Sequence, residues 1–507
     1  MTSINKTQYY LIFFLFFLTC GYFFQGGGWN QNTRICLTRA ILHQQSFIID
    51  AYKEDSIDPP FKFINSGDWA FKDKHYYTNK SPGMSFLALI PFAITEFISG
   101  SIFPENVEKQ VHLSAYISTL CTTTLCASIL ALLVFHICTY FFKFSSSTSL
   151  LLTLFYSLGT FAFSYSTTFY CHIPSACFSF LAFILAMHIK HDINSKWKTY
   201  GFYSGFFAAI AVLIEPSTVF FLFFIFIYLL SFKNGRRSAI FFLLGCFPAG
   251  LLQCFYNTVC FGGPLSSSYQ YSNPDVMWKI GGKLFGIPRP GRFVDLLFLP
   301  YRGLFIVSPI LLMALPGTFS LFKSRKFRAE TLLCLAASIT LLIFIASFYA
   351  WHGGSAIGPR YILPATPFTF VLTLLVYKKF PKTFVTLGVA GILLNLAITL
   401  IGHEAPMEIH NPLTEFVLKN LLANNISINP VPFSNFENYP SIYEFSKPET
   451  WTPNLNSFNL GEFLFPNHII SISPLILCWF FWICLWKRSL SQKNYYDKSK
   501  APLKNKW

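Results

Sequence analysis

A lysine next to a proline stands in one of the most informative short segments of the sequence. Lys80 lies in YYTNKSPGMS, residues 76–85, where a polar stretch gives way to an apolar one. A cation at the edge of a membrane segment needs an anionic partner or a route to water. Lys80 therefore either contacts lipid headgroups or makes a fixed contact to a lipid-linked phosphate, with Tyr77 bordering the site and Pro82 shaping the turn. Its position in the sequence favours neither alternative.

A second group of basic and aromatic residues lies in FYAWHGGSAIGPRYILPATPF, residues 348–368. Arg360, directly before an apolar stretch, either anchors a helix end or binds a phosphate through parallel hydrogen bonds. The aromatic residues around it either form part of an interfacial belt or provide a platform for a sugar. Arg302, in LPYRGLFIVSP, stands at another membrane edge.

The candidate groups for proton transfer are carboxylates and one histidine. Asp68, in SGDWAFKDKHYY, lies closest in sequence to Lys80 and is our first choice for a general base, with Asp50 as the second. The other carboxylates of this region, which we expect to be solvated, are Glu54, Asp55, Asp58 and Asp73. His172, at the end of an apolar stretch, is more typical of a structural hydrogen-bonding group than of a catalyst. Glu215 is flanked by apolar stretches and is expected to face the bundle interior or a wet cavity.

The cysteines give no sign of a metal site. The 13 cysteines are scattered, mostly within apolar stretches, without a C-x-x-C pair or a Cys/His cluster at metal-ligand spacing. We therefore expect buried thiols and no metal ligands, although the acidic first polar region permits a divalent cation as a cofactor. The sequence contains no nucleotide-binding glycine loop, no G-x-S-x-G elbow and no HExxH motif, so the chemistry does not use those motifs.

The composition is that of a membrane protein with many spans. Hydrophobic residues make up 53% of the 507 residues, charged residues only 12%, and 61 residues are phenylalanine. A water-soluble domain could not keep this balance off its surface. Apolar stretches long enough to cross a bilayer lie near residues 8–24, 111–142, 148–166, 173–189, 199–214, 217–232, 238–258, 303–322, 329–350, 361–377, 383–401 and 468–486. The sequence predicts an all-α bundle of about 12 transmembrane helices, or 13 if residues 83–103 also cross.

The distribution of basic residues decides between these two numbers. If residues 83–103 do not cross and the N-terminus is cytoplasmic, four basic loops and the basic C-terminal tail all face the cytoplasm, and these segments, with Lys6 and Lys143, hold more than half of the 38 Lys and Arg. A full crossing would place most of these clusters outside. We therefore expect residues 83–103 to form a juxtamembrane or partly inserted helix, with both termini cytoplasmic in an inner membrane. The net charge of +16 then reports orientation, and a nucleic-acid partner is not expected.

Three outer regions are too long to be simple connections. They are residues 25–110, 259–302 and 402–467. We expect a transmembrane domain over 1–401 that includes the first region, an irregular outer loop over 402–467, and a last helix with a basic tail over 468–507. The segment NQNTRICLTRAIL in the first region has the apolar spacing of a helix lying in the membrane interface.

Five segments, taken in order, resemble a known group of membrane proteins. They are DWAF…YYTNKSPGMSFLALIPF, YSTTFYCHIPSACFSFLAF, YNTVCFGGPLSSSY, LPYRGLFIVSPILLMALPG and WHGGSAIGPRYILPATPF. Together they resemble bacterial polytopic proteins related to the GT-C glycosyltransferases, over roughly residues 8–400. More distantly, NTRICLTRAIL followed by YYTNKSP is similar to the first outer loop of lipid A aminoarabinose transferases and protein O-mannosyltransferases.

The resemblance implies transfer of a sugar from a polyprenyl phosphate to an acceptor hydroxyl on the outer face of the membrane. The lysine before the proline, here Lys80, contacts the carrier phosphate, and an acidic residue opens the first outer loop. This sequence departs from that pattern because Gln31 and Asn32 stand where the acid would be, and neither amide accepts a proton usefully. Asp50 or Asp68 would then replace the acid, or the site is used differently.

The sequence therefore predicts a glycosyltransferase that moves a sugar to a glycan, lipid or protein acceptor of the cell envelope. Asp68, Asp50 and His172 are the candidate catalytic residues. The candidate residues for binding the phosphate and sugar are Lys80, Arg34, Tyr77, Arg302, Trp351, His352, Arg360 and Tyr361. The alternative is a non-catalytic or transport protein of the same fold that binds a lipid phosphate or a polysaccharide precursor.

Overall fold

A computed structural model describes residues 6–52, 66–192, 196–273, 283–323, 325–429, 457–466 and 468–499. Three of the carboxylates expected to be solvated, Glu54, Asp55 and Asp58, lie outside these ranges. So do residues 430–456 of the expected outer loop and the end of the basic tail.

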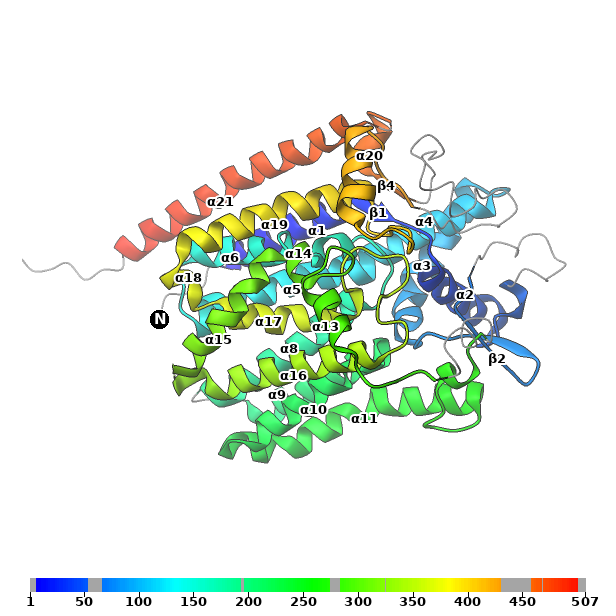
Figure 1. Ribbon diagram of the computed structural model, residues 1–507, viewed down its shortest axis with the longest axis horizontal. Helices are drawn as coiled ribbons and strands as arrows, with labels where there is room; N and C mark the ends of the chain where they lie inside the picture. Colours follow the sequence, from blue (N-terminus) through cyan, green and yellow to red (C-terminus); the bar gives the residue numbers. More distant parts are fainter. Residues whose placement is uncertain are drawn as a thin grey trace, which may run out of the picture.

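The chain forms a bundle of helices that run roughly along one direction (Figure 1). Each of the twelve apolar stretches identified in the sequence contains a helix. These helices are α1 (Lys6–Gly21), α5 (Leu125–His136), α6 (Ser146–Ser157), α8 (His172–His191), α9 (Trp197–Ile214), α10 (Val219–Leu230), α11 (Lys233–Phe261), α15 (Ala314–Lys323), α16 (Arg328–Ser347), α17 (Thr366–Thr373), α19 (Pro381–Ile401) and α21 (Ser473–Ser499).

Seven helices of the described chain are long and apolar enough to cross a membrane. They are Gly83–Ile102, Lys109–Phe141, His172–His191, Lys233–Phe261, Arg325–Ser347, Pro381–Ile401 and Ile469–Ser491. Two shorter apolar helices, Pro216–Leu230 and Pro309–Lys323, also fall within predicted spans. These are the helices of a multi-pass membrane protein, and the total of about 12 crossings stays a prediction.

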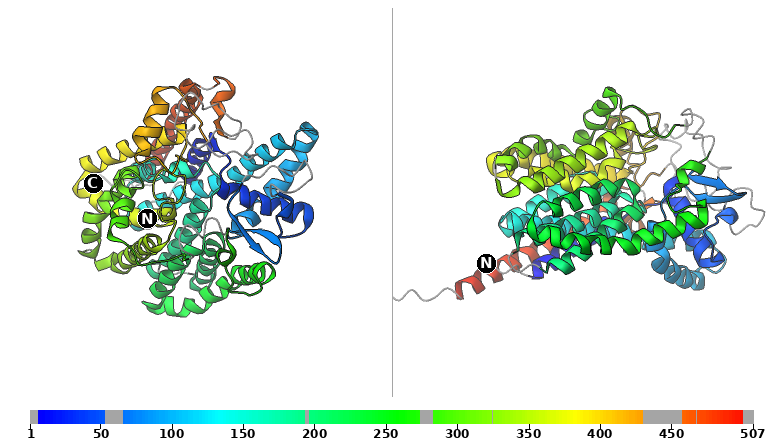
Figure 2. Two further views of the ribbon diagram at one scale, coloured as in Figure 1. Left: turned by 45° about the vertical axis from the view of Figure 1, so that its right-hand side comes forward. Right: turned by 90° about the horizontal axis from the view of Figure 1, so that it is seen from below.

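The first outer region gathers at one end of the bundle. It contains α2 (Trp29–Gln44), a hairpin of β2 (Trp69–Lys72) and β3 (His75–Thr78), α3 (Gly83–Ile102) and α4 (Val107–Thr119). Figure 1 places these elements beyond the ends of the bundle helices, and both views of Figure 2 show the same arrangement. Residues 30–40 of α2 are all buried, so this helix lies deeper in the protein than a helix resting on a membrane surface would.

Helix α3 packs against α2 and α4. It begins where the backbone of α9 ends, since a Cβ on Gly83 would lie 2.6 Å from the Leu213 carbonyl oxygen. Its other face exposes large apolar side chains, among them Ile90 and Phe97. Length and composition allow α3 to cross a membrane, and its expected juxtamembrane position stays a prediction.

Small residues allow α9 and α11 to pack closely. A Cβ on Gly205 would lie 1.8 Å from the Phe242 carbonyl oxygen, and one on Gly245 would lie 2.0 Å from the Phe202 carbonyl oxygen. Helices in membranes associate through such close backbone contacts. This pair carries Glu215 at the end of α9, so its packing positions one part of the site described below.

The first and last parts of the chain are joined. Strand β1 (Phe23–Gln25) pairs antiparallel with β4 (Ser457–Asn459). Below this pair, α21 packs on α1, where the indole nitrogen of Trp479 donates to the Thr19 hydroxyl at 2.8 Å. The described part of the expected outer loop also contains short helical turns, α20 (Lys419–Leu422) among them.

Candidate active site

The hairpin brings Asp68 and Lys80 together. Asp68 directly precedes β2 and Lys80 follows β3, and the pairing of Trp69 with Thr78 places both at the open end of the hairpin. The Lys80 Nζ lies 3.1 Å from an Asp68 carboxylate oxygen, with 11% and 23% of the two side chains exposed. This contact puts a cation and a carboxylate at the end of the bundle where the first outer region gathers.

Arg34 of α2 lies beside this pair. Its Nη1 donates to the carbonyl oxygen of Ser81, the residue after Lys80, at 3.2 Å. Its Nε donates to the Asn30 side-chain oxygen at 3.0 Å, and the residue is almost fully buried. Two predicted phosphate-binding cations therefore come from different elements and meet at one turn.

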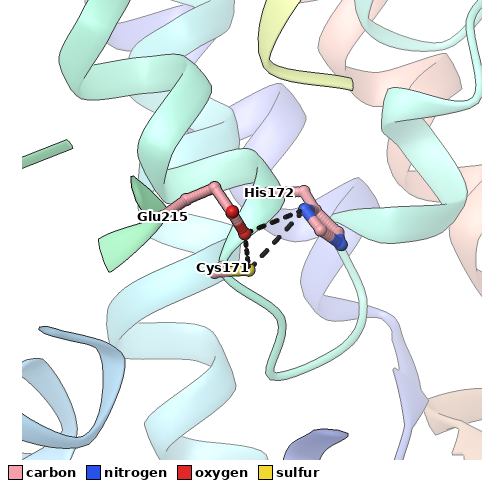
Figure 3. A group of neighbouring side chains, drawn as sticks. All are labelled: Cys171, His172 and Glu215. Atoms are coloured by element: carbon pink, nitrogen blue, oxygen red, sulfur yellow. Dashed lines mark hydrogen bonds and ion pairs between the residues drawn. The ribbon is translucent and has the colours of Figure 1, made fainter. Parts of the chain in front are cut away.

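Cys171, His172 and Glu215 form a cluster where α8 begins and α9 ends (Figure 3). The Cys171 thiol donates to Glu215 Oε2 at 2.9 Å, and His172 Nδ1 lies 3.8 Å from the same oxygen. Burial and Glu215 raise the pKa of Cys171, while the charges of Arg34 and Lys80 act to lower it. The cluster therefore lies within the electrostatic reach of the Lys80 turn.

Tyr269 connects the second outer region to these groups. It belongs to the short helix Ser268–Tyr271, in which the Ser268 hydroxyl donates to the Asn79 carbonyl oxygen at 2.9 Å. Burial raises the pKa of the Tyr269 hydroxyl, and the nearby Glu215 and Asp68 raise it further. Tyr269 is therefore a neutral hydroxyl near these two acidic groups.

A second polar group consists of Tyr170, Arg360 and Glu404. The Tyr170 hydroxyl donates to a Glu404 carboxylate oxygen and accepts a hydrogen bond from Arg360 Nη1 at 3.2 Å. Gly28, with φ 89°, lies against the Glu404 carboxylate, because a Cβ there would come within 2.8 Å of a carboxylate oxygen. This is one position where a left-handed backbone and a close approach both require glycine.

Glu404 is 2% exposed and titrates in an unusual range. Burial raises the pKa of its carboxyl to about 7, against the lowering effects of the Tyr170 hydrogen bond and Arg360, and Asp68 adds to the rise. Burial also lowers the pKa of the neighbouring His403 to about 3, so this histidine is neutral. A carboxyl that titrates near neutral pH has the pKa that suits a general base or acid.

The cluster that contains Cys171 and Glu215 and the second group, which contains Tyr170 and Arg360, meet at His172. Its ring lies 5.7 Å from the Tyr361 ring and 6.0 Å from the Tyr170 ring, both edge-on. Asp68 acts on the pKa of Glu404, which also indicates that the groups belong to one site. The predicted residues that the structure brings together are Lys80, Asp68, Arg34, His172, Arg360 and Tyr361.

Three further predicted binding residues, Arg302, Trp351 and His352, belong to the contacts that support the loop leading to Arg360. Arg302 is fully buried and donates to three backbone carbonyl oxygens, those of Tyr301, His352 and Gly354, at 2.6–2.7 Å. Burial, followed by the charge of Arg302, lowers the pKa of His352 to about 4. The Trp351 ring packs edge-on against Tyr301. In this structure Arg302 holds the loop that leads to Arg360.

Asp50 and Tyr77 have structural contacts away from Lys80. Asp50 accepts a hydrogen bond from the Tyr76 backbone N–H at 2.6 Å and pairs with His75 at 2.7 Å, which fixes the hairpin from the other side. The Tyr77 ring is buried against Phe261 in an apolar cluster. Neither contact reaches the Lys80–Asp68 pair.

Gln31, which stands where the resemblance described above implies an acid, also has a structural role here. Its amide nitrogen donates to the Gln25 carbonyl oxygen at 2.9 Å, and its oxygen accepts from the Phe169 backbone N–H at 3.3 Å. The amide therefore ties α2 to β1 and to the segment before α8, a role that needs both a donor and an acceptor.

Sequence reasoning missed Glu404, Tyr170 and Cys171. Glu404 was included in a region expected to be irregular, and its partner Tyr170 lies 234 residues away in sequence. One signal was present, because Glu404 follows directly after an apolar stretch, as Lys80 directly precedes one. The sequence shows no metal-ligand spacing, and the structure brings Cys171 and His172, which are adjacent, together with Glu215 from another helix.

No protein-family model matches the chain, and no curated protein matches it. Solved structures do match it. ArnT from Cupriavidus metallidurans, a lipid A aminoarabinose transferase, matches in the apo state with 12% identity and a TM-score of 0.44, over 83% of this chain and 65% of ArnT. The same protein bound to undecaprenyl phosphate matches with 10% identity and a TM-score of 0.47, over 84% of this chain and 66% of ArnT.

An archaeal oligosaccharyltransferase is also similar. AglB from Archaeoglobus fulgidus, in complex with an inhibitory peptide and a dolichol-phosphate, matches with 11% identity and a TM-score of 0.49, over 90% of this chain and 61% of AglB. ArnT and AglB are both GT-C enzymes. The chain spans less than two thirds of the length of AglB and about two thirds of that of ArnT.

Proposed function

We propose that this protein transfers a sugar from a polyprenyl-phosphate donor to a hydroxyl of a cell-envelope acceptor at the outer face of the membrane. The observation that carries the proposal is the contact of Lys80 with Asp68 beside the buried Arg34 guanidinium. These groups supply two cations for a phosphate and a carboxylate for a proton at one turn. The donor class comes from the resemblance of the motifs around Lys80.

The proposed step divides the chemistry between these groups. The bond from the anomeric carbon to the phosphate oxygen breaks, and the lipid phosphate leaves with the electron pair. The acceptor oxygen bonds to the anomeric carbon while its proton passes to a carboxylate. Lys80 and Arg34 stabilise the charge that develops on the leaving phosphate, and Asp68 or Glu404 takes the proton, a role worth roughly 10²–10⁴ in rate.

Asp68 and Glu404 differ as candidate bases. Asp68 already contacts the cation that would hold the phosphate. Glu404 has a pKa of about 7, raised by its burial, and it is linked through Tyr170 to Arg360. Asp68 thus has the better position and Glu404 the better matched pKa, and variants of each residue distinguish them.

The experiment measures transfer of radiolabelled sugar from polyprenyl-phosphate donors to envelope acceptors. Membranes carry equal amounts of the wild type, Lys80→Ala, Asp68→Asn or Glu404→Gln. Lys74→Ala and Asp73→Asn, in the turn of the same hairpin, are the matched controls. We expect Lys80→Ala to lose transfer, one of the two carboxylate variants to lose it by about 10²-fold or more, and the controls to retain it.

Full transfer by Lys80→Ala would contradict the phosphate contact. No transfer by the wild type with several donors, combined with Lys80-dependent binding of a polyprenyl phosphate, would favour the non-catalytic or transport alternative. Loss in Glu404→Gln but not in Asp68→Asn would assign the proton to Glu404 and leave Asp68 as the residue that orients Lys80.

A further inference from the structure

Three potential metal ligands converge where α8 and α9 meet. Cys171 and His172 are adjacent at the start of α8, and Glu215 ends α9. One ligand atom from each of these residues lies within 4.8 Å of the other two. Figure 3 shows the three side chains pointing toward one another from two different segments.

One of the three separations is too long for a hydrogen bond, and all three are close to those between ligands of one ion. The His172 Nδ1 lies 3.6 Å from the Cys171 sulfur and 3.8 Å from Glu215 Oε2. A nitrogen–oxygen distance of 3.8 Å is too long for a hydrogen bond. Tetrahedral zinc has bonds of about 2.3 Å to sulfur and about 2.0–2.2 Å to nitrogen or oxygen, which sets its ligand atoms roughly 3.3–3.6 Å apart.

The chemistry of the three donors also fits. A thiolate, an imidazole and a carboxylate are common ligands of Zn²⁺, and three protein ligands leave a fourth position for water or substrate. A Cys171 thiolate and the Glu215 carboxylate would balance the two charges of the ion, and the thiol proton would be released to solvent on binding.

We propose that Cys171, His172 and Glu215 form a binding site for a divalent ion of the zinc class, with its fourth position open. The thiol–carboxylate hydrogen bond seen here is the metal-free arrangement, in which the sulfur keeps its proton. Ion binding needs the Glu215 oxygen to move by roughly 0.6 Å, because its 2.9 Å distance to the sulfur is shorter than the separation of two zinc ligands.

Cobalt provides the test, because a cysteine thiolate bound to Co²⁺ gives a sulfur-to-metal absorption in the near ultraviolet. The full chain, purified in detergent without a histidine tag and stripped with a chelator, is titrated with Co²⁺ and then with Zn²⁺. We expect one Co²⁺ per chain with this absorption, and its loss when Zn²⁺ replaces Co²⁺. No sugar donor is present, so the result is independent of the proposed transferase activity.

The variants distinguish this site from adventitious binding. Cys171→Ser should abolish the absorption, whereas Cys177→Ser, a buried cysteine on the same helix, should leave it unchanged. Glu215→Gln should weaken Co²⁺ binding by about tenfold or more, since even changes to outer partners of ligands cost about 10–100-fold. A wild type that melts normally but shows no thiolate absorption would overturn the proposal, as would an absorption that persists in Cys171→Ser. If Cys171→Ser does not fold, unchanged affinity in Glu215→Gln would overturn it instead.

Discussion

At the scale of single residues, the burial of Glu404 has the clearest consequence for how stability depends on pH. Its pKa of about 7 lies above the ordinary value of 4.5, so the folded protein binds a proton that the unfolded chain releases between these two values. The stability from this carboxyl is fully present below about pH 4.5 and is lost as the pH rises through about 7. This shift in the pKa corresponds to a change of roughly 3 kcal/mol at most in the free energy of unfolding.

We therefore expect Glu404→Gln to raise the apparent melting temperature at about pH 8 and to change it little at about pH 5, because the amide never ionises. Thermal unfolding of the purified protein at both pH values measures this difference. Asp73→Asn, whose carboxylate is 79% exposed, is the control and should change neither value. An equal effect of Glu404→Gln at both pH values would show that Glu404 is not protonated in the folded state.

At this scale the sequence predicts contacts across a short hairpin and misses those made by the fold. Asp68 and Lys80 were chosen because they are close in sequence, and the hairpin brings them into contact. Arg302 was chosen for its position at a membrane edge, but which acceptors it meets depends on a loop about 50 residues away. Glu404 depends on contacts even more distant in the chain, and a single sequence contains no direct sign of them.

At the scale of elements, the close packing of α9 on α11 is the feature that most limits substitution. Gly205→Ala places a methyl group 1.8 Å from a backbone oxygen, so the helices must separate. We expect a loss of about 1–3 kcal/mol, measured as a lower apparent melting temperature in detergent. Gly250→Ala on α11 meets no atom within 4 Å and is the matched control.

The control should keep or slightly raise the melting temperature, because alanine favours a helix over glycine by up to about 1 kcal/mol. Equal melting temperatures for Gly205→Ala and Gly250→Ala would contradict the close contact of the two helices. Because Glu215 ends α9, the Gly205 variant should also weaken Co²⁺ binding at the cluster, without changing any ligand.

Most of the bundle helices could be predicted from the sequence. Apolar stretches of suitable length predicted the bundle helices because burial in lipid requires such stretches. The burial of α2 was not predicted, since its apolar spacing suggested a helix in the membrane interface. Its Arg34 and Gln31 instead bond to Ser81, Gln25 and Phe169, partners that only the assembled fold provides.

At the scale of the whole molecule, the orientation follows from where the basic loops lie. In Figure 1 the start of α1, the end of α21 and α18 (Val376–Lys379), which belongs to a basic loop, all lie at the end opposite the hairpin. Under the positive-inside rule we expect this end to face the cytoplasm. Lys80 and Asp68 would then face outward.

Epitope tags test this orientation and the position of α3 together. Tags inserted after Asp73 and after Glu105, on either side of α3, should both be reached by antibody in intact spheroplasts. A tag after Lys379 should be reached only after permeabilisation. If the tag after Glu105 also needed permeabilisation, α3 would cross the membrane and the number of spans would rise by one.

The pairing of β1 with β4 sets a time order for assembly. A ribosome adding about 5–20 residues per second makes β1 roughly 20–90 seconds before β4, and during that interval the edge of β1 has no strand beside it. Insertion of the early helices therefore cannot complete the end of the protein that carries β1. The β1–β4 pair forms only once nearly the whole chain has been synthesised, so a ribosome that stalls late in the message leaves β1 without its partner strand.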